Sequence, residues 1–422
     1  MNAQIELGYV SMLFIIKFII LALFTLQLAA CSLPSDTDIQ SSDIQLSEDV
    51  QQAVNTGDVS FASSSEELAE SALDTFESGI GQADAIRSAL YGNDNTHVTS
   101  VSWDPTHDAA LLASTFGKNS ELLVSNDNAG NNFNGTPRAL AIAGETNDSR
   151  YAVFGSNPLR HSGKIDEGMN QLIQNTFNWL LQGNNQPNIV MAHLDNSYYF
   201  RDEPTVRAWL TEQYGDNLTV NNENACEGFA LSACINAETD LIIVSQVSDN
   251  DEQANTAAAT IEQAMKQGIP VLYVHHDGNL KTLGKNLFRV FDVTYIQDNY
   301  WPKERVSNLF VNGLQSNLPG NLAAIKTTVH NLMSGNFSFN IADCESKCAN
   351  IDAYGSEFSQ GASAIKSIVD NYDKNGIDIF SEEGNDAIKL IILYADSLRK
   401  NIQYPMSVHS TNTLTWLKAY FA

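Results

Sequence analysis

Six side chains of the kinds that bind metal ions or sugars follow apolar runs of the chain that are typical of buried strands. They are His193, Asp195, Asp249, His275, His276 and Asp277. In open α/β sheets, ligands bind beyond the carboxyl ends of the strands, so imidazoles and carboxylates that converge there would bind a metal ion or a sugar. The alternative is that these are ordinary polar loop residues, with His275 or His276 buried and hydrogen-bonded.

The motifs of common hydrolases are absent from the sequence. Zinc peptidases use His-Glu-x-x-His, since two histidines one helical turn apart hold the metal beside the catalytic base. None of the eight histidines has this spacing, and neither Gly-x-Ser-x-Gly nor the phosphate-binding Gly-x-x-x-x-Gly-Lys-Ser/Thr occurs. No cysteine follows a buried strand as an amidotransferase nucleophile would. The sequence therefore predicts no catalytic residue, no metal ligand and no cofactor.

A second candidate for metal binding is the segment 371–382. It has oxygen-bearing residues at positions 1, 3 and 5, Gly376 at position 6 and Glu382 at position 12, which is the pattern of a calcium loop. It departs from that pattern at Asp378 and at Ile379, which offers no side-chain oxygen. The alternative, which we favour, is a turn that ends a helix, with Gly376 as the left-handed cap.

Four aromatic residues lie in or beside predicted loops. They are Tyr198, Tyr199, Tyr300 and Trp301. Their rings would stack on sugar rings, or they would seal a junction between domains.

The first thirty residues have the pattern of an export signal. An apolar run at 13–28 is followed by small residues, and 28–31 read Leu-Ala-Ala-Cys. This ending resembles the lipobox of bacterial lipoproteins. The resemblance implies that Cys31 is diacylated, becomes the mature N-terminus and anchors the protein. Because Ser32 follows, and not an aspartate, the resemblance favours the outer membrane of a Gram-negative bacterium over retention in the inner membrane. The alternative is an ordinary cleaved signal with an incidental cysteine.

Four further cysteines form two local pairs. They are Cys226 and Cys234, then Cys344 and Cys348. An even number in an exported chain favours disulfides, and pairing within each local pair is the simplest of the three connectivities. The spacing of Cys344 and Cys348 would also suit zinc with a partner pair, but no Cys-x-x-Cys or nearby histidine pair supports that.

Length and charge limit the class of protein. The 422 residues suggest two or three domains, at about 150 residues each. The net charge of −27 argues against nucleic acid as a partner, because phosphates are neutralised by clustered Lys and Arg, and it also disfavours electrostatic docking on anionic lipid.

Strand and helix patterns alternate through the first two thirds of the chain. Residues 65–90 are predicted to be a helix capped by Ser65, and β-rich runs follow. Predicted strands cover 97–103, 121–125, 139–143, 151–155, 189–194, 218–220, 240–246 and 269–274, and predicted helices cover 166–181, 204–214 and 251–266. Continuous apolar strands between helices predict an α/β domain whose parallel sheet, flavodoxin-like or amidotransferase-like, is covered on both faces.

The remainder of the chain is predicted to be an all-helical domain. Its expected helices are 303–314, 321–333, 357–372, 385–401 and 411–421. The predicted organisation is therefore a signal peptide at 1–30, the lipidated cysteine and a flexible tether at 31–64, an α/β N-terminal domain at 65–301 and the helical domain at 302–422.

Several short segments resemble, in order, the N-terminal region of the ImpA family of immunomodulating metalloproteases, which are related to the SslE/AcfD-type surface lipoproteins. The segments are 102–108 (Ser-Trp-Asp-Pro-Thr-His-Asp), 150–158 (Arg-Tyr-Ala-Val-Phe-Gly-Ser-Asn-Pro), 175–180, 376–380, 395–399 and 404–406. The resemblance implies an α/β domain and a helical domain that precede a zinc peptidase domain acting on O-glycosylated proteins.

Two functions follow as expectations. In the first, the chain is the accessory part of such a peptidase, without activity of its own, and it positions glycoprotein substrates for a separate or missing catalytic domain. In the second, it is a self-sufficient surface lipoprotein that binds a glycan, a peptide or an envelope component. No position here matches the family's zinc ligands or catalytic glutamate.

Overall fold

The computed structural model describes residues 45–92, 96–103, 109–114, 119–124, 139–146, 149–160, 165–198, 200–276, 279–300, 378–381, 384 and 386–401. Several predicted features lie outside these residues. They are the signal, Cys31, the pair Cys344 and Cys348, the helices predicted at 303–314, 321–333, 357–372 and 411–421, most of the calcium-type loop, Tyr199, Asp277 and Trp301.

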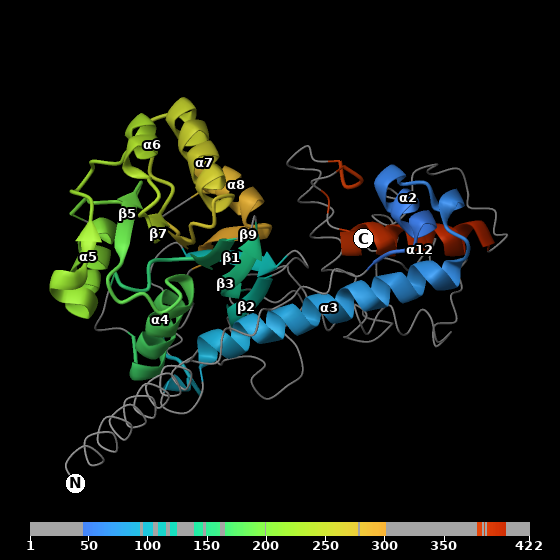
Figure 1. Ribbon diagram of the computed structural model, residues 1–422, viewed down its shortest axis with the longest axis horizontal. Helices are drawn as coiled ribbons and strands as arrows, with labels where there is room; N and C mark the ends of the chain where they lie inside the picture. The colour runs from blue at the N-terminus through green and yellow to red at the C-terminus, as the bar shows by residue number, and fades with distance from the viewer. Residues whose placement is uncertain are drawn as a thin grey trace, which may run out of the picture. The chain divides into compact units, whose positions relative to one another are not determined.

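A mixed sheet lies at the centre of the α/β region (Figure 1). Its described strands are β1 (Ala109–Ser114), β2 (Asn119–Val124), β3 (Ala139–Thr146), β4 (Ser149–Phe154), β5 (Asn188–Ala192), β6 (Thr219–Val220), β7 (Leu241–Val244), β8 (Val271–Val274) and β9 (Val293–Tyr300). The order is β6-β5-β7-β8-β4-β3-β1-β9, and β2 pairs with β3. From β6 to β4 the neighbours are parallel, which confirms the predicted parallel sheet for this half.

The other half of the sheet is antiparallel, which the sequence did not predict. β3 pairs antiparallel with β4, β1 and β2, and β1 pairs antiparallel with β9. Thr146 at the end of β3 pairs with Ser149 at the start of β4, so only two residues connect these strands. A parallel pair needs a crossover of about a dozen residues or more, so this connection permits only an antiparallel hairpin.

Helices cover both faces of the sheet, as the continuous apolar strands predicted. On one face, α4 (Glu167–Leu180) and α5 (Asp202–Tyr214) pack over Leu272 and Val274 of β8. On the other face, α7 (Asp251–Met265) and α8 (Thr282–Val290) pack over Val271 and Tyr273. Figure 1 shows α7 and α8 side by side, with α4 across the strands from them. Successive side chains of a strand point to opposite faces, and this alternation separates the two apolar cores.

Part of the predicted tether is folded. Residues 48–56 form helix α2 (Glu48–Thr56), whose Ser47 cap accepts a hydrogen bond from the Val50 backbone N–H. Val50, Ala53 and Val54 are fully buried, so the prediction of a flexible segment is wrong for these residues. Their spacing is that of one helical face, which gives the short helix a surface to bury.

The helix predicted at 65–90 is confirmed as α3 (Ser65–Tyr91), but the cap is Ser64, whose Oγ accepts from the Glu67 backbone N–H. The helix predicted at 385–401 is α12 (Asp386–Asn401), and it packs against α2 and α3. In the described part of the chain, none of the helices has the length and apolar character needed to cross a membrane.

Several elements besides α2 were not predicted, and one was predicted wrongly. Strands β1 and β9, helix α8 and the short helix α6 (Leu231–Cys234) are present without a predicted counterpart. The run at 97–103 is not a strand: Trp103 forms only an isolated antiparallel bridge with Ile165.

Candidate functional site

Three loops meet at the carboxyl ends of the parallel strands, and Asp202 lies where they join. Asp202 is the first residue of α5 and is fully buried. Its carboxylate accepts hydrogen bonds from Arg160 Nε at 2.9 Å and Arg160 Nη2 at 3.0 Å, from Asn157 Nδ2 at 2.9 Å, and from His276 Nδ1 at 3.1 Å. Asp202 therefore ties the loops that follow β4, β5 and β8 to one another.

These donors control the charge of Asp202. Burial by itself would raise the pKa of this carboxyl, because the ionised form loses its hydration. The hydrogen bond from His276, the positive charge of Arg160 and the bonds from Arg160 and Asn157 outweigh burial and lower the pKa below its usual value. The carboxylate is therefore ionised at neutral pH, and it forms a buried, bidentate ion pair with Arg160.

His276 links this buried pair to Asp195, whose side chain is partly exposed. With Nδ1 assigned as the donor to Asp202, the other ring nitrogen, Nε2, lies 3.7 Å from Oδ2 of Asp195. Phe200 packs edge-on against the imidazole with ring centroids 4.6 Å apart, and the Arg160 guanidinium lies 4.9 Å from the centre of the same phenyl ring. The predicted residues Asp195 and His276 are thus brought together.

His193 does not join them. It has a left-handed backbone with φ of 55° and is 1% exposed. Its Nδ1 lies 2.5 Å from the carbonyl oxygen of Val247, and its Nε2 accepts from the Gly228 backbone N–H at 3.2 Å. Burial lowers the pKa of this imidazole, so it is neutral and both nitrogens are occupied. The alternative interpretation expected a buried, hydrogen-bonded histidine at position 275 or 276, and His193 is one as well.

His275 lies on the opposite face of the sheet from His276. Its Nδ1 is 3.0 Å from the Tyr273 hydroxyl, and its ring packs near Phe288 and Tyr295 in the core under α8. Because side chains alternate along an extended chain, the two adjacent histidines point to different cores. The predicted convergence of three histidines is therefore wrong.

The remaining predicted residues differ in exposure. Asp249 is exposed, and Asp277 lies outside the described residues. Tyr198 is 95% exposed on the loop after β5, next to Ser197, whose N–H and hydroxyl donate to Asp195 Oδ1 at 2.8 and 2.5 Å. The side chain of Tyr300, at the end of β9, lies outside the described residues.

Four residues of this region were not among the predicted site residues: Asn157, Arg160, Asp202 and Glu227. Asn157 and Arg160 directly follow the apolar strand β4, so the rule that led to the other strand-end residues would have found them. The sequence did not indicate a special role for Asp202, because acidic residues are common in the first turn of a helix. Nothing in the local sequence singles out Glu227.

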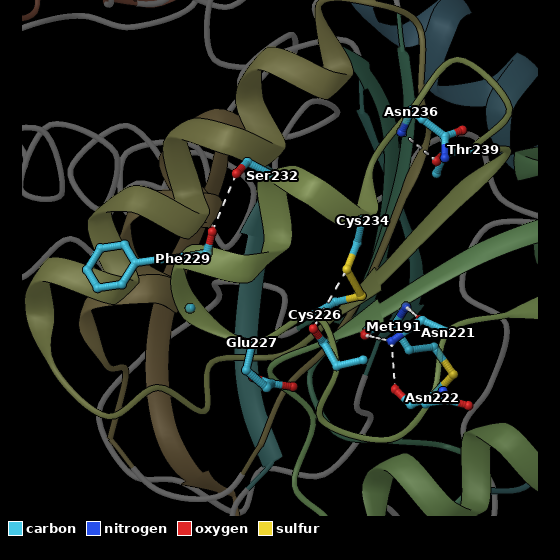
Figure 2. Close-up of a disulfide and its surroundings, with 12 residues drawn as sticks. Met191, Asn221, Asn222, Cys226, Glu227, Phe229, Ser232, Cys234, Asn236 and Thr239 are labelled. Atoms are coloured by element: carbon cyan, nitrogen blue, oxygen red, sulfur yellow. Dashed lines mark hydrogen bonds between the residues drawn. A yellow bond between two sulfur atoms is a disulfide. The ribbon is translucent and has the colours of Figure 1, made fainter.

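Glu227 lies beside the predicted disulfide, which the structure confirms between Cys226 and Cys234 (Figure 2). Its two carboxylate oxygens accept from the His193 backbone N–H at 2.9 and 3.0 Å. Burial, together with the negative charges of Glu203 and Asp249, raises the pKa of Glu227 to about 7. Its carboxylate therefore titrates near neutral pH.

The arrangement does not suit a metal ion. In the part of the chain that the structure describes, no group of three or more His, Cys, Asp or Glu side chains could hold one. The Asp202 network has its partners inside the protein, so its role is to lock three loops together. The accessible residues near this network are Asp195, which is partly exposed, and Tyr198, which is exposed.

Comparison with known families gives two matches along the chain. The immunomodulating metalloprotease N-terminal domain matches residues 93–300, and the immunomodulating metalloprotease helical domain matches residues 326–422. Together these matches span more than half of the chain.

Individual relatives agree with these matches. The curated immunomodulating metalloprotease of Pseudomonas aeruginosa is 24% identical over 192 residues, which are 43% of this chain and 20% of that protein. The structure of IMPa from Pseudomonas aeruginosa in complex with an O-glycopeptide has a TM-score of 0.61 at 16% identity, covering 88% of this chain and 40% of the other. IMPa in complex with T-antigen has a TM-score of 0.54 at 16% identity, covering 89% and 41%. This chain thus spans less than half the length of each of these relatives.

Proposed function

We propose that this chain, which belongs to the immunomodulating metalloprotease family, is an accessory, non-catalytic part of a zinc metallopeptidase that acts on glycoproteins. The observation that carries the proposal is the pair of matched domains, which are the N-terminal and the helical domain of that family. The 422 residues contain no His-Glu-x-x-His. Among the residues that the structure describes, no set fits a catalytic zinc, so no hydrolytic step is assigned to them.

The accessory role is to hold a glycoprotein for a catalytic domain. Support comes from the solved relatives, which were determined with an O-glycopeptide and with T-antigen. The locked strand-end loops support it as well, because a binding surface needs loops whose positions do not change. In this chain the network of Asp202, Arg160 and His276 provides that rigidity, and Tyr198 is exposed on one of the joined loops, the one that follows β5.

The proposal includes a membrane anchor. Cys31, in the Leu-Ala-Ala-Cys sequence, would carry two acyl chains on a glyceryl group and hold the protein in the outer membrane. Stable anchoring needs two hydrophobic signals, and a diacylated cysteine supplies both.

Binding and cleavage by the purified chain test the proposal together. A mucin-type glycoprotein would be immobilised before and after enzymatic removal of its O-glycans, and binding of the chain followed by interferometry. We expect binding that is lost on deglycosylation, and no cleavage with added zinc. Cleavage that a chelator abolishes would overturn the non-catalytic assignment. Binding to an envelope component but to no glycoprotein would favour the alternative, a self-sufficient surface lipoprotein.

A further inference from the structure

A groove runs along the outer face of α7, away from the loops that Asp202 joins. Its volume is about 670 Å³, within the usual range of about 300–1,000 Å³ for small-ligand sites. One side is formed by the short helix α6 (Leu231–Cys234) and the residue after it, and the floor and other side by α7. The lining consists of Ser232 and Ile235 on the α6 side and of residues of α7 and its C-terminal end, among them Thr256, Thr260 and Gln263.

The lining contains no charged side chain, although the whole chain has a net charge of −27. A metal ion or an amine would need a carboxylate in the groove, and a phosphate or sulfate would need Lys or Arg. Glu262 and Lys266 of the same helix pair with each other at 2.7 Å and do not line the groove. The absence of charge among the lining residues selects a neutral ligand.

The polar atoms of the groove are suited to hydroxyl groups. Thr256 and Thr260 donate their hydroxyl hydrogens to backbone carbonyls one turn earlier, at 2.9 and 2.8 Å, so their remaining lone pairs accept. The Oδ1 of Asn255 accepts from Asn286, which leaves the Asn255 amide hydrogens as donors. Gln263 and Gln267 are exposed and offer both donors and acceptors. Each sugar hydroxyl both donates and accepts, so this mixture matches it.

Only three side chains of the lining are apolar, and none of them is aromatic. Ala259 and Ala264 lie between the polar side chains, and Ile235 lies on the opposite side. These groups can contact the C–H face of a sugar ring, whereas an amphipathic helix would require large apolar anchors. A saccharide therefore fits the groove better than a peptide helix does.

A disulfide holds the α6 side of the groove in place. Cys234 ends α6 and is bonded to Cys226, which is fully buried in the core under α7 (Figure 2). Ser232 and Ile235 flank Cys234 in the sequence, so the covalent bond limits how far this side can move. Because the groove is preformed, less conformational entropy of the protein is lost when a ligand binds.

We propose that the groove between α6 and α7 binds a neutral oligosaccharide. This site is separate from the strand-end loops, and it goes beyond the proposed function because it assigns a saccharide-binding groove that the accessory role does not require.

Calorimetric titration of the full chain tests this inference, with the disaccharide galactosyl-N-acetylgalactosamine and the trisaccharide of N-acetylglucosamine as neutral probes. We expect saturable binding of at least one, with a dissociation constant below about 1 mM. Ala259→Arg places a long side chain in the groove and should weaken binding more than about tenfold. Ala208→Arg is the matched control, because Ala208 is exposed on α5, which covers the opposite face of the sheet.

A second variant removes polar atoms without filling the groove. Thr260→Val combined with Gln263→Ala should weaken binding about fivefold or more, since each neutral hydrogen bond typically contributes a factor of a few. Both positions are on the outer face of α7, and thermal unfolding checks that the fold is retained. A sialylated form of the disaccharide should bind more weakly, because the groove offers no cation for its carboxylate.

Three results would overturn the inference: no saturable binding of either neutral probe, binding that survives Ala259→Arg, or equal groove-dependent binding of an unglycosylated Ser/Thr-rich peptide. Its failure is distinguishable from failure of the proposed function. If neither free saccharide binds but the glycoprotein does, the groove is excluded as a saccharide site and the accessory role is retained. If the free saccharide binds but glycoproteins do not, the saccharide site in the groove is supported and the accessory role is excluded.

Discussion

Nδ1 of His276 lies 3.1 Å from Oδ2 of Asp202, and this contact joins two segments that are 74 residues apart in the sequence. The same carboxylate forms a bidentate ion pair with Arg160, which comes from a third segment. One buried side chain therefore joins three strand-end loops.

Replacing Asp202 should destabilise the whole domain. Asp202→Asn leaves the guanidinium of Arg160 buried without its counter-charge, which typically costs about 3–5 kcal/mol of unfolding free energy. Because the folded-state pKa of Asp202 is lowered, its contribution is fully present above the pKa of the unfolded chain and is lost as pH falls through the folded value. Urea unfolding at several pH values measures both effects. Asp216→Asn, at an exposed position, is the control and should change little.

Glu227 should make stability fall as pH rises toward neutrality. Its folded-state pKa of about 7 lies above the ordinary value of 4.5, so the folded protein binds the proton more tightly than the unfolded chain does. The unfolding free energy therefore decreases between about pH 4.5 and 7 and is level above that. The side chain is 34% exposed, so the effect is discounted to about 1 kcal/mol.

Glu227→Gln keeps an acceptor for the His193 N–H and removes the titration. The variant should match the wild type near pH 4.5 and exceed it at pH 8, as measured by urea unfolding. Glu238→Gln, which is exposed on the same connection, serves as the control. Identical pH profiles for Glu227→Gln and the wild type would contradict the assignment.

The disulfide should stabilise the protein by constraining the unfolded chain. Cys226 and Cys234 are separated by 8 residues, and closing so short a loop is expected to contribute about 2.5 kcal/mol. Replacing both cysteines with serine tests this by chemical unfolding, with the reduced wild type as a comparison. Mass mapping under non-reducing conditions should also find Cys344 joined to Cys348, and free thiols at that pair would disprove the local pairing.

Two glycines should respond to alanine in opposite ways. A Cβ at Gly155, where β4 ends, would lie 2.1 Å from the Ala110 carbonyl oxygen, so Gly155→Ala should cost about 1–3 kcal/mol. Gly81 lies within α3, and an added Cβ there meets nothing within 4 Å. Gly81→Ala should therefore stabilise by about 0.5–1 kcal/mol. Thermal unfolding of the pair compares the two, and equal shifts would contradict the packing at Gly155.

Lipidation should depend on Cys31 alone. In a Gram-negative host, the full chain should incorporate labelled palmitate and fractionate with the outer membrane, whereas Cys31→Ser should do neither. Cys234→Ser is the control, since it removes a disulfide-bonded cysteine from the folded domain and leaves the sequence around Cys31 unchanged. Label retained in Cys31→Ser would exclude the lipoprotein assignment.

The sequence by itself determined the elements with strong periodicity. The strands β5, β7 and β8 were predicted from short, continuous apolar runs rich in Val and Ile, and helices α4 and α7 from segments long enough to show a helical pattern. The pairing of Cys226 with Cys234 was also predictable, since the two are close in the chain. The family resemblance rested likewise on short local segments.

Only the tertiary structure decided which distant residues meet. The pairing of β1 with β9 joins ends of the α/β region, and no local pattern encodes it. Adjacent in sequence, His275 and His276 were separated by the alternation of an extended chain, so one entered the core under α8 and the other reached Asp202. Spacing along the chain fixes which side a residue faces relative to its neighbours, whereas the partner it finds depends on how loops far apart in sequence close over the sheet.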